Sequence, residues 1–117
     1  MCGRYTLAST DPTALRDRFG LGESVEIRQR FNVAPTDEVL AVVSGVDGPH
    51  GALLRWGLVP HWADGLASGA KRINARAETV ATTAAFRDSF ARHRCLVIAD
   101  GFYEWERLED GGKQPWH

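Results

Sequence analysis

The apolar residues of this chain fall into short runs separated by glycine- and proline-containing segments, and this punctuation limits the folds open to it. Short, β-branched runs between turn residues are typical of strands. We therefore predict strands at residues 3–7, 38–44, 52–58, 95–99 and 101–108. Because helical segments are interspersed among them, the sequence predicts an α+β fold with a mixed, mainly antiparallel sheet.

Turn-forming residues predict two hairpins. Residues 45–51 join the two strands on either side of them, and residues 110–112 join the last strand to a return strand at 113–117. Residues 21–37 are predicted to be irregular, and 63–70 to form a loop of small residues. Because the return strand is short and would leave an open backbone edge, we expect residues 1–117 to be the N-terminal part of one domain of a longer protein.

A first helix is predicted over residues 11–19, with Pro12 in its first turn and Gly20 ending it. Its candidate N-cap residues are Ser9, Thr10 and Asp11. Its helically spaced apolar positions, expected in the core, are Ala14, Leu15 and Phe19.

A second helix is predicted over residues 83–93, capped by Thr82 or Thr83. Phe86 and Phe90 are spaced i, i+4 and should share its buried face. A shorter helix is expected to begin at residues 76–81.

Composition and charge exclude several classes of protein. A 44% hydrophobic content can fill a core, which excludes wholesale disorder. The apolar runs are far too short to span a membrane, and no signal peptide opens the chain. The two cysteines, Cys2 and Cys95, cannot build a disulfide framework or a C-x-x-C metal site, so we expect no metal and a reducing, cytoplasmic setting.

The net charge of −1 excludes a uniformly basic protein but conceals a local imbalance. Residues 71–94 hold six cations and two anions, a net +4, whereas residues 100–117 hold five anions and two cations, a net −3. The basic middle segment suits a phosphate backbone.

Cys2 is the first candidate for chemistry. Removal of Met1 would leave a 1,2-aminothiol at the N-terminus. Its amine can condense with an aldehyde to an imine, and its thiol can then add to the same carbon and close a thiazolidine ring. The same group could attack an acyl carbon as an N-terminal nucleophile. A cysteine at position 2 can also be incidental or simply buried.

Asn74, Arg76 and Glu104 are the next candidates. The Asn74 amide could orient a substrate oxygen, and Arg76 could hold a phosphate bidentately. Glu104 lies among aromatic residues in a predicted strand, where a carboxylate could transfer protons. Each also has a structural explanation: a loop cap, a solvated arginine and an edge glutamate bonded to backbone.

Tryptophans next to cations are typical of single-stranded nucleic-acid grooves, in which bases stack and phosphates pair. Arg4 and Trp62 are the candidates for this role, because Trp62 precedes a flexible loop. Trp56 lies in a predicted strand and is expected in the core. The other members of the set are His61, Trp105 and Trp116.

Five stretches together resemble the SRAP family of abasic-site-processing proteins, in order and with family-like spacing. They are MCGRY at 1–5, RFNVAPT at 30–36, RWGLVPHW at 55–62, INARAET at 73–79 and RCLVIADGFYEW at 94–105. The resemblance implies a curled, barrel-like sheet with flanking helices and a basic DNA channel.

The resemblance also implies a function without a cofactor. Such proteins bind single-stranded DNA and attach covalently to abasic sites. Cys2 would attack the ring-opened sugar, Asn74 would contact that sugar, and Glu104 would assist proton transfers. Arg4 and Arg76 would contact phosphates. Self-processing as a peptidase is implied as well, and we expect a cytoplasmic, DNA-associated monomer without membrane contact.

One departure is the family's catalytic histidine, which lies in a C-terminal half that this chain does not reach. The four histidines present do not match it; they are His50, His61, His93 and His117. Two alternatives therefore stay open: an N-terminal-nucleophile cysteine peptidase or amidohydrolase with no DNA role, and an inactive truncated fragment.

Overall fold

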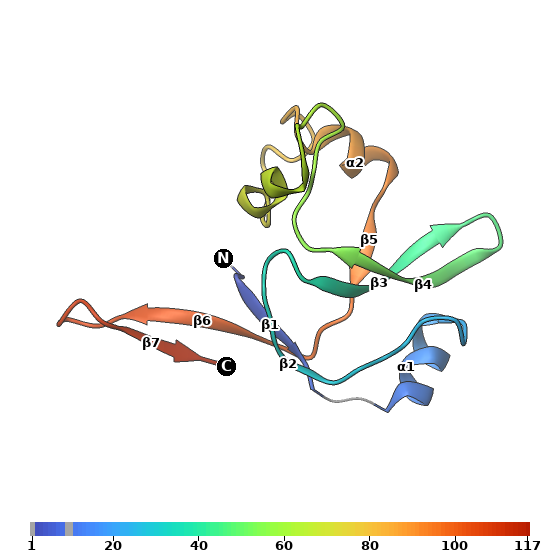
Figure 1. Cartoon of the computed structure of the whole chain (residues 1–117), viewed down its shortest axis with the longest axis horizontal. Helices are drawn as coiled ribbons and strands as arrows, with labels where there is room; N and C mark the ends of the chain where they lie inside the picture. Colours follow the sequence, from blue (N-terminus) through green and yellow to red (C-terminus); the bar gives the residue numbers. More distant parts are fainter. Residues whose placement is uncertain (1, 9–10) are drawn as a thin grey trace.

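The computed structural model describes residues 2–8 and 11–117. Two antiparallel sheets form a half-barrel (Figure 1). The first sheet has the order β2-β1-β6-β7, with β1 at Arg4–Leu7, β2 at Arg30–Val33, β6 at Gly101–Arg107 and β7 at Lys113–Trp116. The second has the order β4-β3-β5, with β3 at Glu38–Gly45, β4 at Gly48–Arg55 and β5 at Cys95–Val97. The α+β class is confirmed, and all five strand pairings of the described residues are antiparallel.

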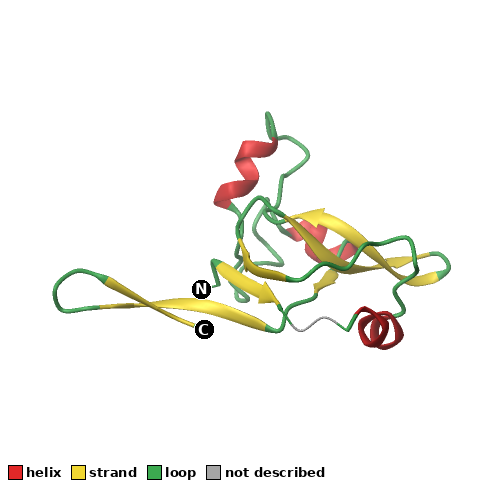
Figure 2. Ribbon diagram, turned by 60° about the horizontal axis from the view of Figure 1, so that its bottom comes forward, coloured by secondary structure: helices red, strands yellow, loops and turns green. Residues whose placement is uncertain are grey.

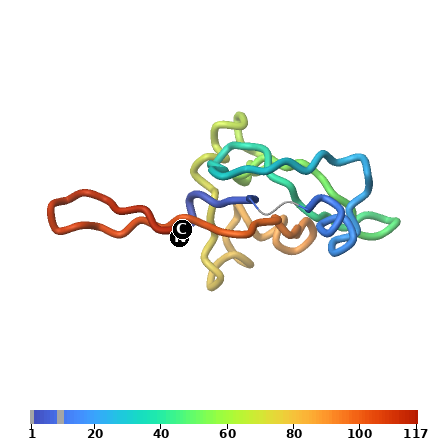
Figure 3. Tube along the Cα trace, turned by 90° about the horizontal axis from the view of Figure 1, so that it is seen from below, coloured from blue at the N-terminus to red at the C-terminus, as the bar shows by residue number. Residues whose placement is uncertain are grey.

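The helices lie at the periphery of the sheets (Figure 2). They are α1 at Pro12–Phe19, the 3-10 helix η1 at Leu66–Lys71 and α2 at Arg87–Arg92. The hairpin of β6 and β7 projects away from the rest of the molecule (Figure 3), whose principal extents are 53 × 36 × 26 Å. No helix within the described residues is long and apolar enough to cross a membrane.

Two apolar clusters hold the sheets together. The larger joins both sheets through six buried side chains: Leu7, Leu21, Val25, Leu40, Val42 and Ile98. The smaller consists of Tyr5, Val33 and Val39, with Cys2 and Trp56 packed against it. Full burial of one such aliphatic side chain stabilises the fold by about 1.5–3 kcal/mol. The smaller cluster therefore anchors the N-terminal strand that carries Cys2.

Helix α1 forms as predicted. Asp11 is its N-cap, with its carboxylate accepting from the N–H groups of Thr13 and Ala14, and Gly20 ends it. The alternative caps, Ser9 and Thr10, lie outside the described residues. Leu15 and Phe19 pack against the larger cluster. Ala14 was wrongly predicted as a core residue, because α1 turns that face to solvent.

The region between residues 76 and 93 is less helical than predicted. Residues 76–81 form turns, and α2 covers only Arg87–Arg92. The hydroxyls of Thr82 and Thr83 both donate to the Thr79 carbonyl, at 3.2 and 2.8 Å, so they close a preceding turn and do not cap α2. Phe90 is 42% exposed, so the expected burial of both phenylalanines is wrong for Phe90.

Other boundaries also differ from the prediction. Strand β2 forms within the segment expected to be irregular, because it is stabilised by pairing with β1 and not by local residue preferences.

The first hairpin turn is shorter than predicted and consists of Val46 and Asp47, so β4 starts earlier and ends before Trp56. The 63–70 loop contains most of η1, and β5 ends at Val97. The second hairpin and its return strand β7 are confirmed.

Candidate functional site

Cys2 and Asn74 lie together in one cavity of about 530 Å³. The Asn74 side-chain amide donates a hydrogen bond to the Cys2 carbonyl at 3.0 Å, across 72 residues of sequence. The Cys2 thiol is half-buried and lies 3.5 Å from the Arg4 carbonyl oxygen. Residues of β1, β6 and the 73–74 segment thus converge on the one cysteine predicted to be a nucleophile.

Trp56 positions the segment that carries Asn74. Its indole N–H donates to the Ile73 carbonyl at 3.1 Å, directly before Asn74. Its ring packs on Tyr5, with centroids 5.5 Å apart. Trp56 lies just beyond β4, so its prediction as a strand residue is wrong. Its side chain is half-buried and packs against the smaller cluster. Sequence reasoning missed its part in the cavity wall, although its place in a matched motif was a signal.

The turn after Trp56 depends on a close backbone approach. Gly57 has φ +123°, and a Cβ there would lie 2.5 Å from the Gly69 carbonyl oxygen. Leu58 donates its N–H to the Arg72 carbonyl at 3.0 Å. These contacts fold residues 57–72 into a closed loop that leads into Asn74.

Tyr5 and Phe102 form part of the apolar wall of the cavity. They are directly paired across β1 and β6, so their side chains share one face of the sheet. Tyr5 is 6% exposed, and burial raises its pKa to about 12 despite the opposing charge of Arg30. The Tyr5 hydroxyl is therefore neutral at physiological pH. Neither residue was singled out from the sequence.

Glu104 follows on β6, one residue beyond the pair formed by Tyr103 and Arg4, toward the end of β1 where Cys2 lies. It pairs with Trp116 on its other side and is half-buried. Glu104 is not among the residues that line the cavity. The structure thus places it on the strand next to the cavity, while Cys2 and Asn74 are inside it.

None of the three predicted DNA-binding residues lines the cavity, and Trp62 lines a separate hollow together with Arg72. Arg4 donates to the Asn32 side chain at 3.0 Å, and Arg76 is exposed in the 76–83 turns. Trp62 is 51% exposed and stands edge-on to His61, with centroids 4.8 Å apart. An exposed indole of this kind is available for stacking.

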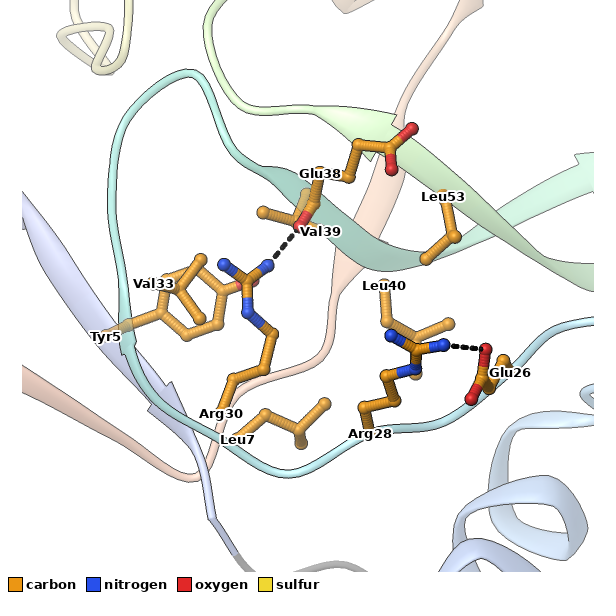
Figure 4. A pocket seen from close by; sticks show the side chains of 10 residues that line it. All are labelled: Tyr5, Leu7, Glu26, Arg28, Arg30, Val33, Glu38, Val39, Leu40 and Leu53. Atoms are coloured by element: carbon orange, nitrogen blue, oxygen red, sulfur yellow. Dashed lines mark hydrogen bonds and ion pairs between the residues drawn. The ribbon is translucent and has the colours of Figure 1, made fainter.

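A second cavity, of about 330 Å³, shares the Tyr5 ring with the first (Figure 4). Its arginines are already paired. Arg30 bonds Asp37 at 2.6 Å and Arg28 bonds Glu26 at 2.6 Å. The Ala34 N–H and Arg30 together hold the pKa of Asp37 below its usual range. Neither Cys2 nor Asn74 is among the residues that line this cavity.

Among the described residues, no group of three or more His, Cys, Asp or Glu side chains could hold a metal ion. Both Cys2 and Cys95 are free thiols. The first cavity presents the Cys2 thiol, the Asn74 amide and the Asp100 carboxylate, and Glu104 lies on the adjoining strand β6.

The fold and this cavity define a class: α+β half-barrels with a cysteine at position 2 held next to an asparagine. The family model described as "SOS response associated peptidase (SRAP)" matches residues 1–117. The chain belongs to the SRAP family, as its motifs predicted.

Its relatives carry consistent names. The chain is 42% identical over 120 residues to abasic site processing protein YoaM of Bacillus subtilis (strain 168), covering 98% of this chain and 52% of YoaM. It is 41% identical over 142 residues to abasic site processing protein HMCES of Xenopus tropicalis, covering 100% of this chain and 42% of HMCES. The chain thus spans about half the length of the curated relatives it matches.

A solved structure supports the fold. The chain superimposes on a crystal structure of a protein from Bordetella bronchiseptica with a TM-score of 0.75 and 27% identity, covering 97% of this chain and 55% of the other. The expected barrel-like, antiparallel architecture is therefore shared with a longer protein.

Proposed function

We propose that this protein processes abasic sites in DNA by joining Cys2 covalently to the aldehyde of the lesion, which shields the site. The observation that carries the proposal is the pairing of Cys2 with Asn74 inside one cavity. The names of the relatives supply the substrate class: abasic site processing is what YoaM and HMCES are named for.

The chemistry requires a free α-amine on Cys2, so Met1 must first be removed. The amine attacks the aldehyde carbon of the ring-opened deoxyribose, and loss of water gives an imine. The thiol then adds across the C=N bond, its proton passing to the nitrogen, and a thiazolidine closes. The net change is the release of one water. Because both nucleophiles belong to one residue, ring closure is intramolecular and fast.

Two side chains assist in this proposal. The Asn74 side-chain amide donates a hydrogen bond to the Cys2 carbonyl, and this bond holds the nucleophile against the cavity wall. Glu104 transfers protons during sugar-ring opening and loss of water. Its position one step along β6 from the Arg4–Tyr103 pair supports that role.

We propose single-stranded DNA as the partner of a monomer. Arg4 and Arg76 would pair with phosphates on either side of the lesion, and the Trp62 indole would stack on a neighbouring base. The exposure of Arg76 and Trp62 supports this assignment, because neither side chain needs to leave a buried position to meet DNA.

The test uses the protein after mass spectrometry has shown that Met1 is absent. It is incubated with a uracil-containing single-stranded oligonucleotide treated with uracil-DNA glycosylase, and heat-stable adducts are resolved on a denaturing gel. We expect an adduct for the wild type and none for Cys2→Ala. A full yield of adduct from Cys2→Ala would refute the proposal.

The same experiment distinguishes the proposed crosslinking from the peptidase alternative and from the self-processing that the family's name suggests. An N-terminal-nucleophile peptidase would cleave a peptide substrate and would not react with abasic DNA.

Cys2→Ser tests which group of Cys2 closes the ring. A serine keeps the α-amine and can form the imine, and reduction by borohydride would trap that imine. Trapping without a heat-stable adduct would identify the thiol as the group that closes the ring.

A further inference from the structure

A polar cluster adjoins the Cys2 cavity, because one of its members, Asp100, also lines that cavity. Thr6 is the buried polar residue among those that the structure describes, with 2% of its surface exposed. Its hydroxyl donates a hydrogen bond to the Asp100 carboxylate at 2.8 Å, and the His117 Nε2 atom lies 3.0 Å from the same hydroxyl oxygen. A hydroxyl has one proton and an ionised carboxylate only accepts. The His117 Nε2 atom must therefore carry a proton and donate it to Thr6.

Asp100 fastens the residues before β6 to β1 at two further points. Its other carboxylate oxygen accepts from the Ala8 N–H at 2.7 Å, and its own N–H donates to the Thr6 carbonyl at 3.0 Å. Asp100 thus forms hydrogen bonds to β1 and the residue after it through both its side chain and its backbone.

The imidazole of His117 completes the cluster. The ring packs on Tyr103, with ring centroids 4.8 Å apart. It also lies directly against the backbone of Gly101. A Cβ at Gly101 would lie 2.5 Å from the His117 Nε2 atom. Glycine at this position therefore lets the ring reach Thr6. Tyr103 is itself tied to β2, because its hydroxyl donates to the Phe31 carbonyl at 2.9 Å.

The pairing of β1 with β6 needs such support. It consists of three residue pairs: Arg4 with Tyr103, Tyr5 with Phe102, and Thr6 with Gly101. A slip of one residue would turn every side chain to the opposite face. The β2 side cannot fix the register alone, since the β1–β2 pairing is irregular between Tyr5 and Leu7.

We infer that Asp100, Thr6 and His117 form a positioning cluster that sets the register of β1 against β6 and thereby aligns Cys2 with Glu104. Thr6 acts through the backbone, because its side chain faces away from the side of β1 on which Tyr5 lines the cavity, whereas Asp100 lies in the cavity wall itself. The kinetic consequence of the cluster rests on the proposed function.

The test compares Thr6→Val with Thr6→Ser. Valine keeps the shape of threonine but removes the hydroxyl, whereas serine keeps the hydroxyl. Adduct formation is followed over time at increasing concentrations of abasic single-stranded DNA. For Thr6→Val we expect the rate constant at saturation to fall roughly ten- to a hundredfold, because small misplacements of reacting groups are this costly. We expect the half-saturating concentration to change by less than about twofold.

Controls distinguish positioning from loss of folded protein. Partial unfolding lowers the final yield of adduct, whereas misalignment lowers the rate constant at an unchanged yield. Thr6→Ser should restore most of the rate, and Thr82→Val, which removes the hydroxyl of an exposed turn, should leave it at the wild-type value. A wild-type rate constant for Thr6→Val, or a loss confined to yield, would overturn the inference.

A spectroscopic measurement tests the cluster even if no adduct forms at all. The ¹⁵N chemical shifts of the His117 ring should report a proton on Nε2 in the neutral ring of the wild type and of Thr6→Ser. The preference should disappear in Thr6→Val. Absence of adduct with the tautomer preference intact would refute the proposed function and leave the cluster standing. A Thr6→Val spectrum identical to the wild type would contradict the cluster itself.

Discussion

The side-chain amide of Asn74 donates to the backbone carbonyl of Cys2 at 3.0 Å, and this contact joins the start of the chain to a loop 72 residues away. The hydrogen bond is half-buried and the two residues share a cavity. It therefore couples the position of the proposed nucleophile to the fold of residues 57–74.

Asn74→Asp should weaken the site, because a carboxylate cannot donate to the Cys2 carbonyl and would repel it. Loss of one such hydrogen bond costs about 1–3 kcal/mol. We expect slower adduct formation and a fall in melting temperature of several degrees. Gln114→Glu is the matched control, because that amide is exposed on β7. Equal effects of the two variants would contradict the assignment.

Trp56→Phe removes the indole N–H that bonds the Ile73 carbonyl but keeps an aromatic ring next to Tyr5. The freed carbonyl costs about 1 kcal/mol. We expect faster amide hydrogen exchange in residues 73–76 and a reduced rate of adduct formation. Trp116→Phe on exposed β7 serves as the control for loss of an indole, and it should leave exchange in 73–76 unchanged.

Gly57→Ala should destabilise the fold by about 2–4 kcal/mol, because a Cβ would collide with the Gly69 carbonyl in addition to the cost of a positive φ. Gly65→Ala isolates the second contribution, since Gly65 also has a positive φ, of +144°, but no atom within 4 Å of its added Cβ. Urea unfolding measures both variants. Similar losses of free energy would show that the close approach to Gly69 is not the cause.

The raised pKa of the buried Tyr5 phenol predicts that the free energy of unfolding falls at alkaline pH. Its pKa is raised to about 12 in the folded protein by burial, against about 10 in an unfolded chain. The neutral phenol is thus favoured by folding. Its contribution is complete below pH 10 and is lost as the pH rises toward 12. Urea unfolding across this range should show a steeper decline for the wild type than for Tyr5→Phe, and parallel curves would contradict the burial of a neutral phenol.

Arg4→Ala and Arg76→Ala should each weaken non-covalent binding to undamaged single-stranded DNA. If each arginine meets one phosphate, the slope of log affinity against log salt should shrink by about 0.7 per substitution. Fluorescence anisotropy over a salt series measures the slope. Arg18→Ala, in the last turn of α1, is the control. An unchanged slope for Arg4→Ala or Arg76→Ala would remove that residue from the interface.

Patterns close in sequence predicted much of this fold. The Asp11 cap, the end of α1 at Gly20 and both hairpins depend on neighbouring residues, so local propensity suffices. Strand β2 and the short α2 could not be predicted in this way. Pairing with β1 creates the first, and hydroxyls that bond back to Thr79 shorten the second.

The sequence by itself determined the family and pointed to the residues proposed to react: a cysteine at position 2, Asn74, Glu104 and the motifs around them. Only the tertiary structure decided that Cys2 and Asn74 share a cavity, that Trp56 fixes the Ile73 carbonyl, and that Thr6, Asp100 and His117 meet. The physical reason is distance along the chain. These contacts join residues whose approach depends on strand register and packing, and no local pattern of residue types encodes either.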